Sequence, residues 1–249
     1  MNPQSTTRNP QSTPSAALDA RVAVITGGTG GLGTHVTTAF LQAGCTCHVT
    51  YRLAHERQAL EQQVSTGRER LILHSLDATD PDQVHRLYRT VAEESGRLDF
   101  LLNLVGGFAA KPIEDTGPDL WDKMVAINAR SAFLNIRQAV ALMRQTPGGC
   151  IVNVSAAAAQ RCPPRMAAYV AAKAAVMAMT RSLAKELADE QISVNAILPT
   201  TIDTPANRKA MPDADFSTWN DPREIARRLV ALAGDPDRPT GELIELDAT

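Results

Sequence analysis

Tyr169 and Lys173 stand four residues apart in the alanine-rich stretch YVAAK. In a helix this spacing places both side chains on one face, where an ammonium can stabilise a phenolate and lower a phenol pKa that is ordinarily about 10. A phenol adjusted in this way can exchange a proton with an alcohol or a carbonyl group. Of the three tyrosines, only Tyr169 has a lysine at this spacing. The pattern favours acid–base chemistry, with an ordinary amphipathic helix surface as the alternative.

Two further polar residues extend this hypothesis. Ser155 ends the run CIVNVS, which we expect to be a strand. A hydroxyl at the carboxyl end of a parallel strand lies where such sheets bind ligands, so it can donate to a substrate oxygen. Asn128 lies within an expected long helix after Trp121, where it either holds a water molecule beside Lys173 or is a solvated helix residue.

The stretch TGGTGGLG follows the apolar run RVAVI and precedes a helical pattern. In this context, backbone N–H groups and the start of a helix can meet a pyrophosphate without a Cβ in the way. A P-loop is excluded because Thr34 stands where that motif needs lysine. We therefore predict a dinucleotide-binding turn, with a glycine-rich turn that binds no ligand as the alternative. The glycines form two registers, Gly28, Gly30 and Gly33 with GxGxxG spacing, and Gly27, Gly31 and Gly33 with GxxxGxG spacing.

The end of the second expected strand predicts which dinucleotide binds. A ribose 2′-hydroxyl is usually held by an acid about 20 residues after the glycines, whereas a 2′-phosphate needs a cation. The stretch HVTYRLAHE has no acid before Glu56, and Arg52 presents a planar guanidinium that suits a phosphate. We predict NADP rather than NAD, with a solvated Arg52 as the alternative.

These residues need a scaffold, and the remaining pattern predicts one. Short apolar runs alternate with stretches of helical period, as in a doubly wound parallel sheet, the Rossmann fold, of about seven strands with helices on both faces. We expect a single α/β domain over residues 21–249 after a disordered tail over residues 1–20. The expected helices lie near residues 32–43, 55–65, 81–95, 119–144, 167–190 and 222–233. The expected strands are Val22–Thr26, Thr46–Tyr51, Leu71–Ser75, Phe100–Leu104, Cys150–Ser155, Ser193–Leu198 and Leu243–Leu246.

Composition excludes several classes of function. The net charge is −2, and the basic residues are scattered, so we expect no nucleic-acid partner. No apolar stretch reaches membrane-spanning length and no signal peptide is evident, so we expect a cytoplasmic protein with no membrane partner. The four cysteines show neither CxxC spacing nor a disulfide framework, and we expect no metal.

Along Arg21 to Asp247, the chain resembles the classical short-chain dehydrogenases/reductases. TGGTGGLG resembles that family's TGxxxGxG, LDATD resembles the segment whose Asp contacts the adenine ring, NLVGG resembles NNAG, and ILPTTIDTP resembles PGxxxT. The family's catalytic tetrad falls in order on Asn128, Ser155, Tyr169 and Lys173.

The resemblance implies a role for each of these residues. Tyr169 would be the general acid in reduction, Lys173 would lower the Tyr169 pKa and bind the nicotinamide ribose, and Ser155 would orient the carbonyl. Asn128 would hold a proton-relay water. The resemblance also implies a small-molecule substrate and a homotetramer or dimer. The implied cofactor-binding residues are Thr26, Gly27, Thr29, Gly31, Leu32, Gly33, Arg52, Asp77, Ala78, Asn103, Val105, Gly106, Tyr169, Lys173, Pro199, Ile202 and Thr204.

The segment Leu198 to Trp219 resembles the corresponding part of dihydropteridine reductase, and VGGF resembles its AGGW. We expect a substrate lid near residues 204–219, with Trp219 either stacking on a flat substrate or packing as an anchor. Three functions follow: an NADP(H)-dependent oxidoreductase acting on a carbonyl or alcohol, a pterin-type reductase, and a non-catalytic dinucleotide sensor.

Overall fold

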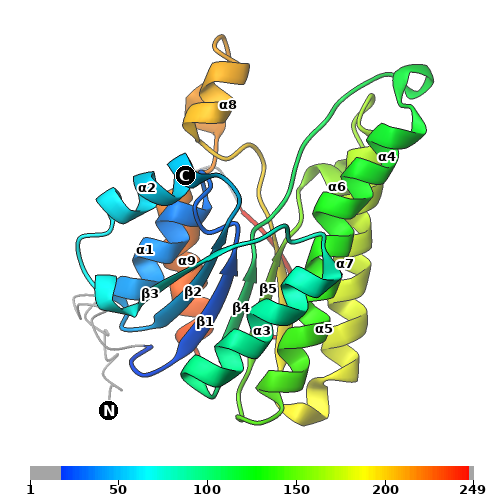
Figure 1. Ribbon diagram of the computed structural model, residues 1–249. Helices are drawn as coiled ribbons and strands as arrows, with labels where there is room; N and C mark the ends of the chain where they lie inside the picture. Colours follow the sequence, from blue (N-terminus) through cyan, green and yellow to red (C-terminus); the bar gives the residue numbers. More distant parts are fainter. Residues whose placement is uncertain (1–17, 247–249) are drawn as a thin grey trace, which may run out of the picture.

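The computed structural model describes residues 18–246. Within them, seven strands form one parallel sheet in the order β3-β2-β1-β4-β5-β6-β7 (Figure 1). The predicted fold is confirmed, and β4, β5 and β7 each end one residue earlier than expected. The strands are β1 (Val22–Thr26), β2 (Thr46–Tyr51), β3 (Leu71–Ser75), β4 (Phe100–Asn103), β5 (Cys150–Val154), β6 (Ser193–Leu198) and β7 (Leu243–Glu245).

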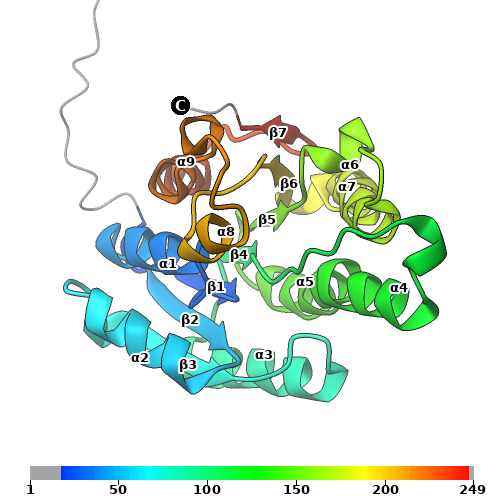
Figure 2. The same ribbon diagram turned by 90° about the horizontal axis from the view of Figure 1, so that it is seen from above.

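Helices cover both faces of the sheet. One face packs on α1, α2 and α9, and the other packs on α3, α5 and α7 (Figure 2). Successive residues of β1 alternate between the two cores, so the run Val22 to Ile25 must be apolar on both faces, as its sequence is. The α-helices are α1 (Gly33–Gln42), α2 (Ala54–Gln63), α3 (Pro81–Ser95), α4 (Pro118–Val125), α5 (Ser131–Met143), α6 (Ala158–Arg161), α7 (Ala167–Glu186), α8 (Pro205–Ala210) and α9 (Pro222–Gly234).

Two expected helices differ from the structure. The helix expected over residues 119–144 is divided into α4, a five-residue π-helical segment at Ala126–Arg130, and α5. The helix expected over residues 167–190 stops at Glu186 and continues as a 3-10 turn at Ala188–Glu190. Sequence period does not distinguish a π-turn from an α-turn, and such turns occur often at functional sites.

Two helices begin with a proline that follows a capping aspartate. The Asp80 carboxylate accepts hydrogen bonds from the N–H groups of Asp82 and Gln83, and α3 then begins at Pro81. The Asp221 carboxylate accepts from Arg223 N at the start of α9. Each carboxylate satisfies backbone donors that the first helical turn leaves unpaired.

The expected N-terminal tail is outside the described residues except for 18–20. These three residues form a turn, and Leu18 is 1% exposed, with its N–H donating to Ala43 O at 3.1 Å. The ordered chain therefore begins before Arg21, because Leu18 has an apolar side chain to bury. Among the described residues, no helix combines the length and apolarity needed to cross a membrane.

The order of the strands determines where a ligand can bind. From β1 the chain proceeds outward through β2 to β3, and then returns to β4 on the other side of β1. The connections after β1 and β4 therefore leave the sheet toward opposite faces. A crevice opens at such a switch point, at the carboxyl ends of the strands.

A buried histidine pair joins β2 to β3 beneath the end of α3. His48 Nδ1 lies 2.9 Å from His74 Nε2, and His48 Nε2 lies 2.8 Å from Ser95 Oγ. His48 is fully buried, and this burial, together with the adjacent His74, lowers its pKa to about 4. The folded state therefore holds His48 neutral.

We expect this pair to make stability depend on pH. The unfolded chain binds a proton on His48 near pH 6.5, whereas the folded chain binds it only near pH 4. Above pH 6.5, neutral His48 makes its full contribution to the free energy of unfolding. Up to about 3 kcal/mol of that contribution is lost as the pH falls toward 4. Urea unfolding at pH 7 and pH 4.5 should show a smaller pH-dependent loss in His48→Gln than in wild type. An equal loss in both would contradict the assignment, and His85→Gln, at an exposed site on α3, is the control.

Candidate active site and dinucleotide cleft

The glycines of the β1–α1 turn are required by close packing of the main chain. A Cβ on Gly33 would lie 2.1 Å from the Gly27 carbonyl oxygen, and Gly27 has a φ of +63°, which disfavours any side chain. The Gly27 N–H donates to Thr50 Oγ1 at 2.9 Å, which ties the turn to β2. The predicted turn therefore depends on its glycines for its tight fold.

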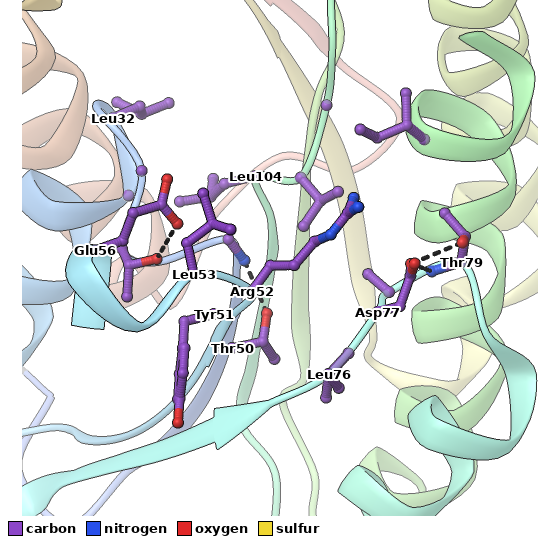
Figure 3. A pocket seen from close by; sticks show the side chains of 18 of the residues that line it. Leu32, Thr50, Tyr51, Arg52, Leu53, Glu56, Leu76, Asp77, Thr79 and Leu104 are labelled. Carbon is purple, nitrogen blue, oxygen red and sulfur yellow. Dashed lines mark hydrogen bonds between the residues drawn. The ribbon is translucent and has the colours of Figure 1, made fainter. Parts of the chain in front are cut away.

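A cleft of about 610 Å³ adjoins this turn at the carboxyl edge of the sheet (Figure 3). It is walled by the β1–α1 turn and by the segments that follow β2, β3 and β4. An unsubstituted main chain beside a cleft of this size fits a dinucleotide. The expected cofactor residues that line it are Gly27, Thr29, Gly31, Leu32, Gly33, Arg52, Asp77, Ala78, Val105 and Gly106.

Two expected cofactor residues instead hold the sheet edge together. The Thr26 hydroxyl accepts from Leu104 N at 3.1 Å, and Asn103 Nδ2 donates to Asn153 Oδ1 at 2.9 Å. Both side chains are buried and lie outside the cleft lining. Asn103 Oδ1 is a buried oxygen without a hydrogen-bond partner among the described residues.

The segment after β6 lies over the glycine turn rather than in the cleft wall. A Cβ on Gly31 would lie 2.7 Å from Thr204 Cγ2, and the Thr204 hydroxyl accepts from Asn207 N at the start of α8. Ile202 forms a β-bridge with Asn220, and Pro199 O accepts from Ala157 N at 3.0 Å. Three expected cofactor residues of this segment, Pro199, Ile202 and Thr204, are therefore not among the residues that line the cleft.

The end of the cleft beyond β2 and β3 contains charges of both signs. Asp77 Oδ1 accepts from the N–H and the hydroxyl of Thr79 at 2.9 and 2.7 Å, and these bonds, with a smaller effect of Arg52, lower the Asp77 pKa. Glu56 also lines the cleft, and its Oε2 accepts from Thr29 Oγ1 at 3.3 Å. The sequence pattern indicated no acid near Arg52 because Glu56 comes later in the chain, but α2 begins at Ala54 and turns it inward.

Asn128 and Lys173 meet at the other end of the cleft, beside Gly106. A Cβ on Gly106 would lie 2.9 Å from Asn128 Oδ1 and 3.2 Å from Lys173 Nζ. Asn128 is 2% exposed, its Oδ1 accepts from Gly107 N at 3.1 Å, and its Nδ2 donates to Gly107 O at 3.0 Å. Asn128 is therefore not a solvated helix residue, because it fixes the loop after β4.

Ser155 and Lys173 connect β5 to α7 in both directions. Lys173 Nζ donates to Val154 O at 2.8 Å, and Ser155 Oγ donates to Lys173 O at 2.8 Å. Tyr169 lies one turn earlier on α7 and is partly exposed. Asn128 and Lys173 thus flank Gly106 at the cleft, and Ser155 and Tyr169 adjoin Lys173, although none of the four is among the residues that line the cleft.

The pKa of the Tyr169 phenol shifts in the direction opposite to the one expected from the sequence. Burial raises the pKa of Tyr169 to about 12 and lowers the pKa of Lys173 to about 8. The expected depression of the phenol pKa is absent because burial disfavours the charged phenolate. Tyr169 is therefore protonated at neutral pH, in the form that can donate a proton to a carbonyl oxygen.

An aromatic side chain borders Tyr169 on its open side. Phe108 is 62% exposed, and its ring meets the Tyr169 ring edge-on, with centroids 5.0 Å apart. Phe108 ends the sequence motif VGGF, but that motif alone indicated no role for it. The contact gives the proposed proton donor an apolar neighbour.

The expected lid contains α8, which stands at the carboxyl edge of the sheet (Figure 1). Arg208 donates two hydrogen bonds to Asp203, and its guanidinium lies 4.6 Å from the centroid of the Phe216 ring. Phe216 in turn packs on Trp219, which is only 7% exposed. Trp219 therefore packs as an anchor, and closure of the segment over a substrate stays a prediction.

No group of three or more metal-ligating side chains occurs within residues 18–246.

Comparison with known proteins agrees with this geometry. The family model for short chain dehydrogenases matches residues 21–215. The chain is 36% identical over 197 residues to cyclopentanol dehydrogenase of Comamonas sp. (strain NCIMB 9872), covering 78% of each protein. It is 32% identical over 220 residues to D-beta-hydroxybutyrate dehydrogenase of Rhizobium meliloti (strain 1021), covering 88% of this chain and 85% of that protein. A solved short-chain dehydrogenase/reductase from Burkholderia xenovorans superposes with a TM-score of 0.84 at 27% identity, covering 94% of this chain and 97% of that one. The chain belongs to the short-chain dehydrogenase/reductase family.

Proposed function

We propose that this protein is an NADP(H)-dependent oxidoreductase that interconverts a ketone and a secondary alcohol, with Tyr169 as the acid and base. The observation that carries the proposal is that Asn128 and Lys173 flank Gly106, which lines the glycine-walled cleft, while Ser155 bonds to Lys173 O and Tyr169 lies one turn before Lys173 on α7. Binding alone would need the cleft but not the polar groups at its end. Their presence favours an enzyme over a dinucleotide sensor.

The cleft residues fit a dinucleotide along their whole length. The N–H groups of the β1–α1 turn would hold the pyrophosphate, Asp77 and Ala78 would flank the adenine, and Arg52 would hold a 2′-phosphate. Gly106 leaves space for a ribose beside Lys173. The bound nicotinamide would supply or accept the hydride.

Each catalytic side chain then has a distinct task. Tyr169, with its high pKa, gives its hydroxyl proton to the carbonyl oxygen of the substrate. The Lys173 ammonium favours the resulting phenolate, because an adjacent positive charge stabilises it. Ser155 orients the substrate oxygen by exchanging its bond to Lys173 O for one to that oxygen.

The substrate class follows from the surroundings of Tyr169. The exposed ring of Phe108 provides an apolar surface that suits a small cyclic or aliphatic ketone. The two relatives are named for cyclopentanol and D-beta-hydroxybutyrate, both secondary alcohols. The pterin hypothesis has no support, because the side chain of Trp219 is buried rather than available for stacking.

We expect purified protein to oxidise NADPH in the presence of small ketones, and to do so faster than it oxidises NADH at equal concentrations. The panel should include cyclopentanone, acetoacetate and a quinonoid dihydropterin, with absorbance of the reduced nicotinamide as the readout. Binding of NADPH without turnover of any ketone would indicate a sensor instead. Tighter binding of NADH than of NADPH would overturn the cofactor proposal.

A further inference from the structure

The adenosine end of the cleft contains a carboxylate as well as a guanidinium. Arg52 follows the last residue of β2, and Glu56 lies in the first turn of α2, and both line the cleft. Arg52 extends toward the side of Asp77, whereas Glu56 turns toward the glycine loop (Figure 3). The two charges therefore occupy the same end of the cleft without contacting one another as an ion pair.

Neither charge forms an ion pair with a described residue. Among residues 18–246, the Glu56 side chain accepts one hydrogen bond, from Thr29 Oγ1 at 3.3 Å, and forms no ion pair. Within the same residues, Arg52 forms no ion pair, although its charge contributes to the lowered Asp77 pKa. A ligand at this end of the cleft would therefore meet both a positive and a negative charge.

The two groups favour different ligands. A guanidinium attracts a 2′-phosphate, whereas a carboxylate repels it and can accept a hydrogen bond from a 2′-hydroxyl. The Thr29 hydroxyl belongs to the glycine turn, so its bond holds Glu56 beside the part of the cleft that contacts the nucleotide. Glu56 and Arg52 should therefore act in opposition.

We propose that Glu56, held by Thr29, is a specificity-determining residue that weakens the preference of this site for a 2′-phosphate and sustains binding of NAD. This inference rests on the proposed dinucleotide function and deepens it. Arg52 alone would give a strongly NADP-selective site. The pair instead makes a site that accepts both nucleotides, with a modest preference set by the balance of the two charges.

The test is isothermal titration of NADP⁺, NAD⁺ and adenosine 2′,5′-bisphosphate without substrate. Glu56→Gln keeps the side-chain length and an oxygen that can accept from Thr29, but removes the charge. We expect affinity for NADP⁺ and for the bisphosphate to rise about fivefold or more, and affinity for NAD⁺ to stay level or fall. The gain should shrink at high ionic strength, because salt screens an exposed charge. Glu93→Gln is the matched control, since it makes the same change in an exposed ion pair on α3.

The outcomes separate this inference from the proposed function. An unchanged or lowered affinity of Glu56→Gln for NADP⁺ and the bisphosphate, in a protein that still binds NAD⁺, would overturn the role of Glu56 alone. An equal gain in Glu93→Gln would also overturn it, because the effect would then be one of net charge. Failure of the wild-type protein to bind any of the three ligands would overturn the proposed function as well.

Discussion

Tyr169→Phe should lose about 10²–10⁴-fold in kcat for ketone reduction while retaining its fold and nucleotide affinity. The substitution removes one hydroxyl, which makes no hydrogen bond to any described residue, so no buried partner is left unsatisfied. The aromatic ring stays, and with it the edge-on contact to Phe108. Steady-state kinetics, calorimetric titration of the nucleotide and thermal unfolding together measure these three properties.

Tyr88→Phe is the control for this experiment. Tyr88 lies on the buried face of α3, and its hydroxyl donates to Asn135 Oδ1 on α5 at 3.2 Å, outside the cleft lining. We expect this variant to lose about 1 kcal/mol of stability and almost no turnover, the reverse of Tyr169→Phe. If Tyr169→Phe kept turnover within a few-fold of wild type, Tyr169 would not be the proton donor.

The second large effect should come from Lys173→Met, which preserves most of the side-chain volume and removes the ammonium. Turnover should fall at least about 10²-fold, because the phenolate loses its positive neighbour. Stability should also fall, by about 1–3 kcal/mol, because the buried Val154 carbonyl loses its donor. Nucleotide affinity should fall too, since the ammonium lies beside the ribose space at Gly106.

The pH profile distinguishes this role from a purely structural one. Burial lowers the Lys173 pKa to about 8, so the ammonium is lost as the pH rises through that value. Wild-type kcat/KM should therefore decline above about pH 8, because this ratio reports the groups of the free enzyme. Lys173→Met should retain only low activity, without that decline. A wild-type profile that is flat from pH 7 to 9.5 would exclude the ammonium from the chemistry.

The sheet and most helices could be predicted from the sequence because their signals are local. A parallel strand covered on both faces reads as a largely apolar run, and VAVIT was placed correctly for that reason. Helix starts could be predicted where aspartate precedes proline. The positions of Ser155, Tyr169 and Lys173 followed from the ends and faces of these elements.

The errors arose where direction depends on tertiary contacts. Asn103 is the last residue of β4, one residue before the expected end, and its amide turns toward Asn153 on the neighbouring strand instead of the cleft. The π-helical segment could not be predicted, because its geometry comes with the bonds from Asn128 to Met124 and Gly107. The pKa of Tyr169 depends on burial and on where the lysine nitrogen points, and spacing alone determines neither.

The hydrogen bonds of the proposed catalytic side chains also determine which positions of the site can be substituted without altering the structure. Ser155, Lys173 and Asn128 each bond to main-chain atoms of a different segment, so a substitution at any of them alters architecture and chemistry together. Phe108 is different, since its ring is largely exposed and contacts Tyr169 only by its edge. Descendants of this protein could therefore acquire new substrates by changing Phe108 while inheriting the proton-transfer apparatus intact.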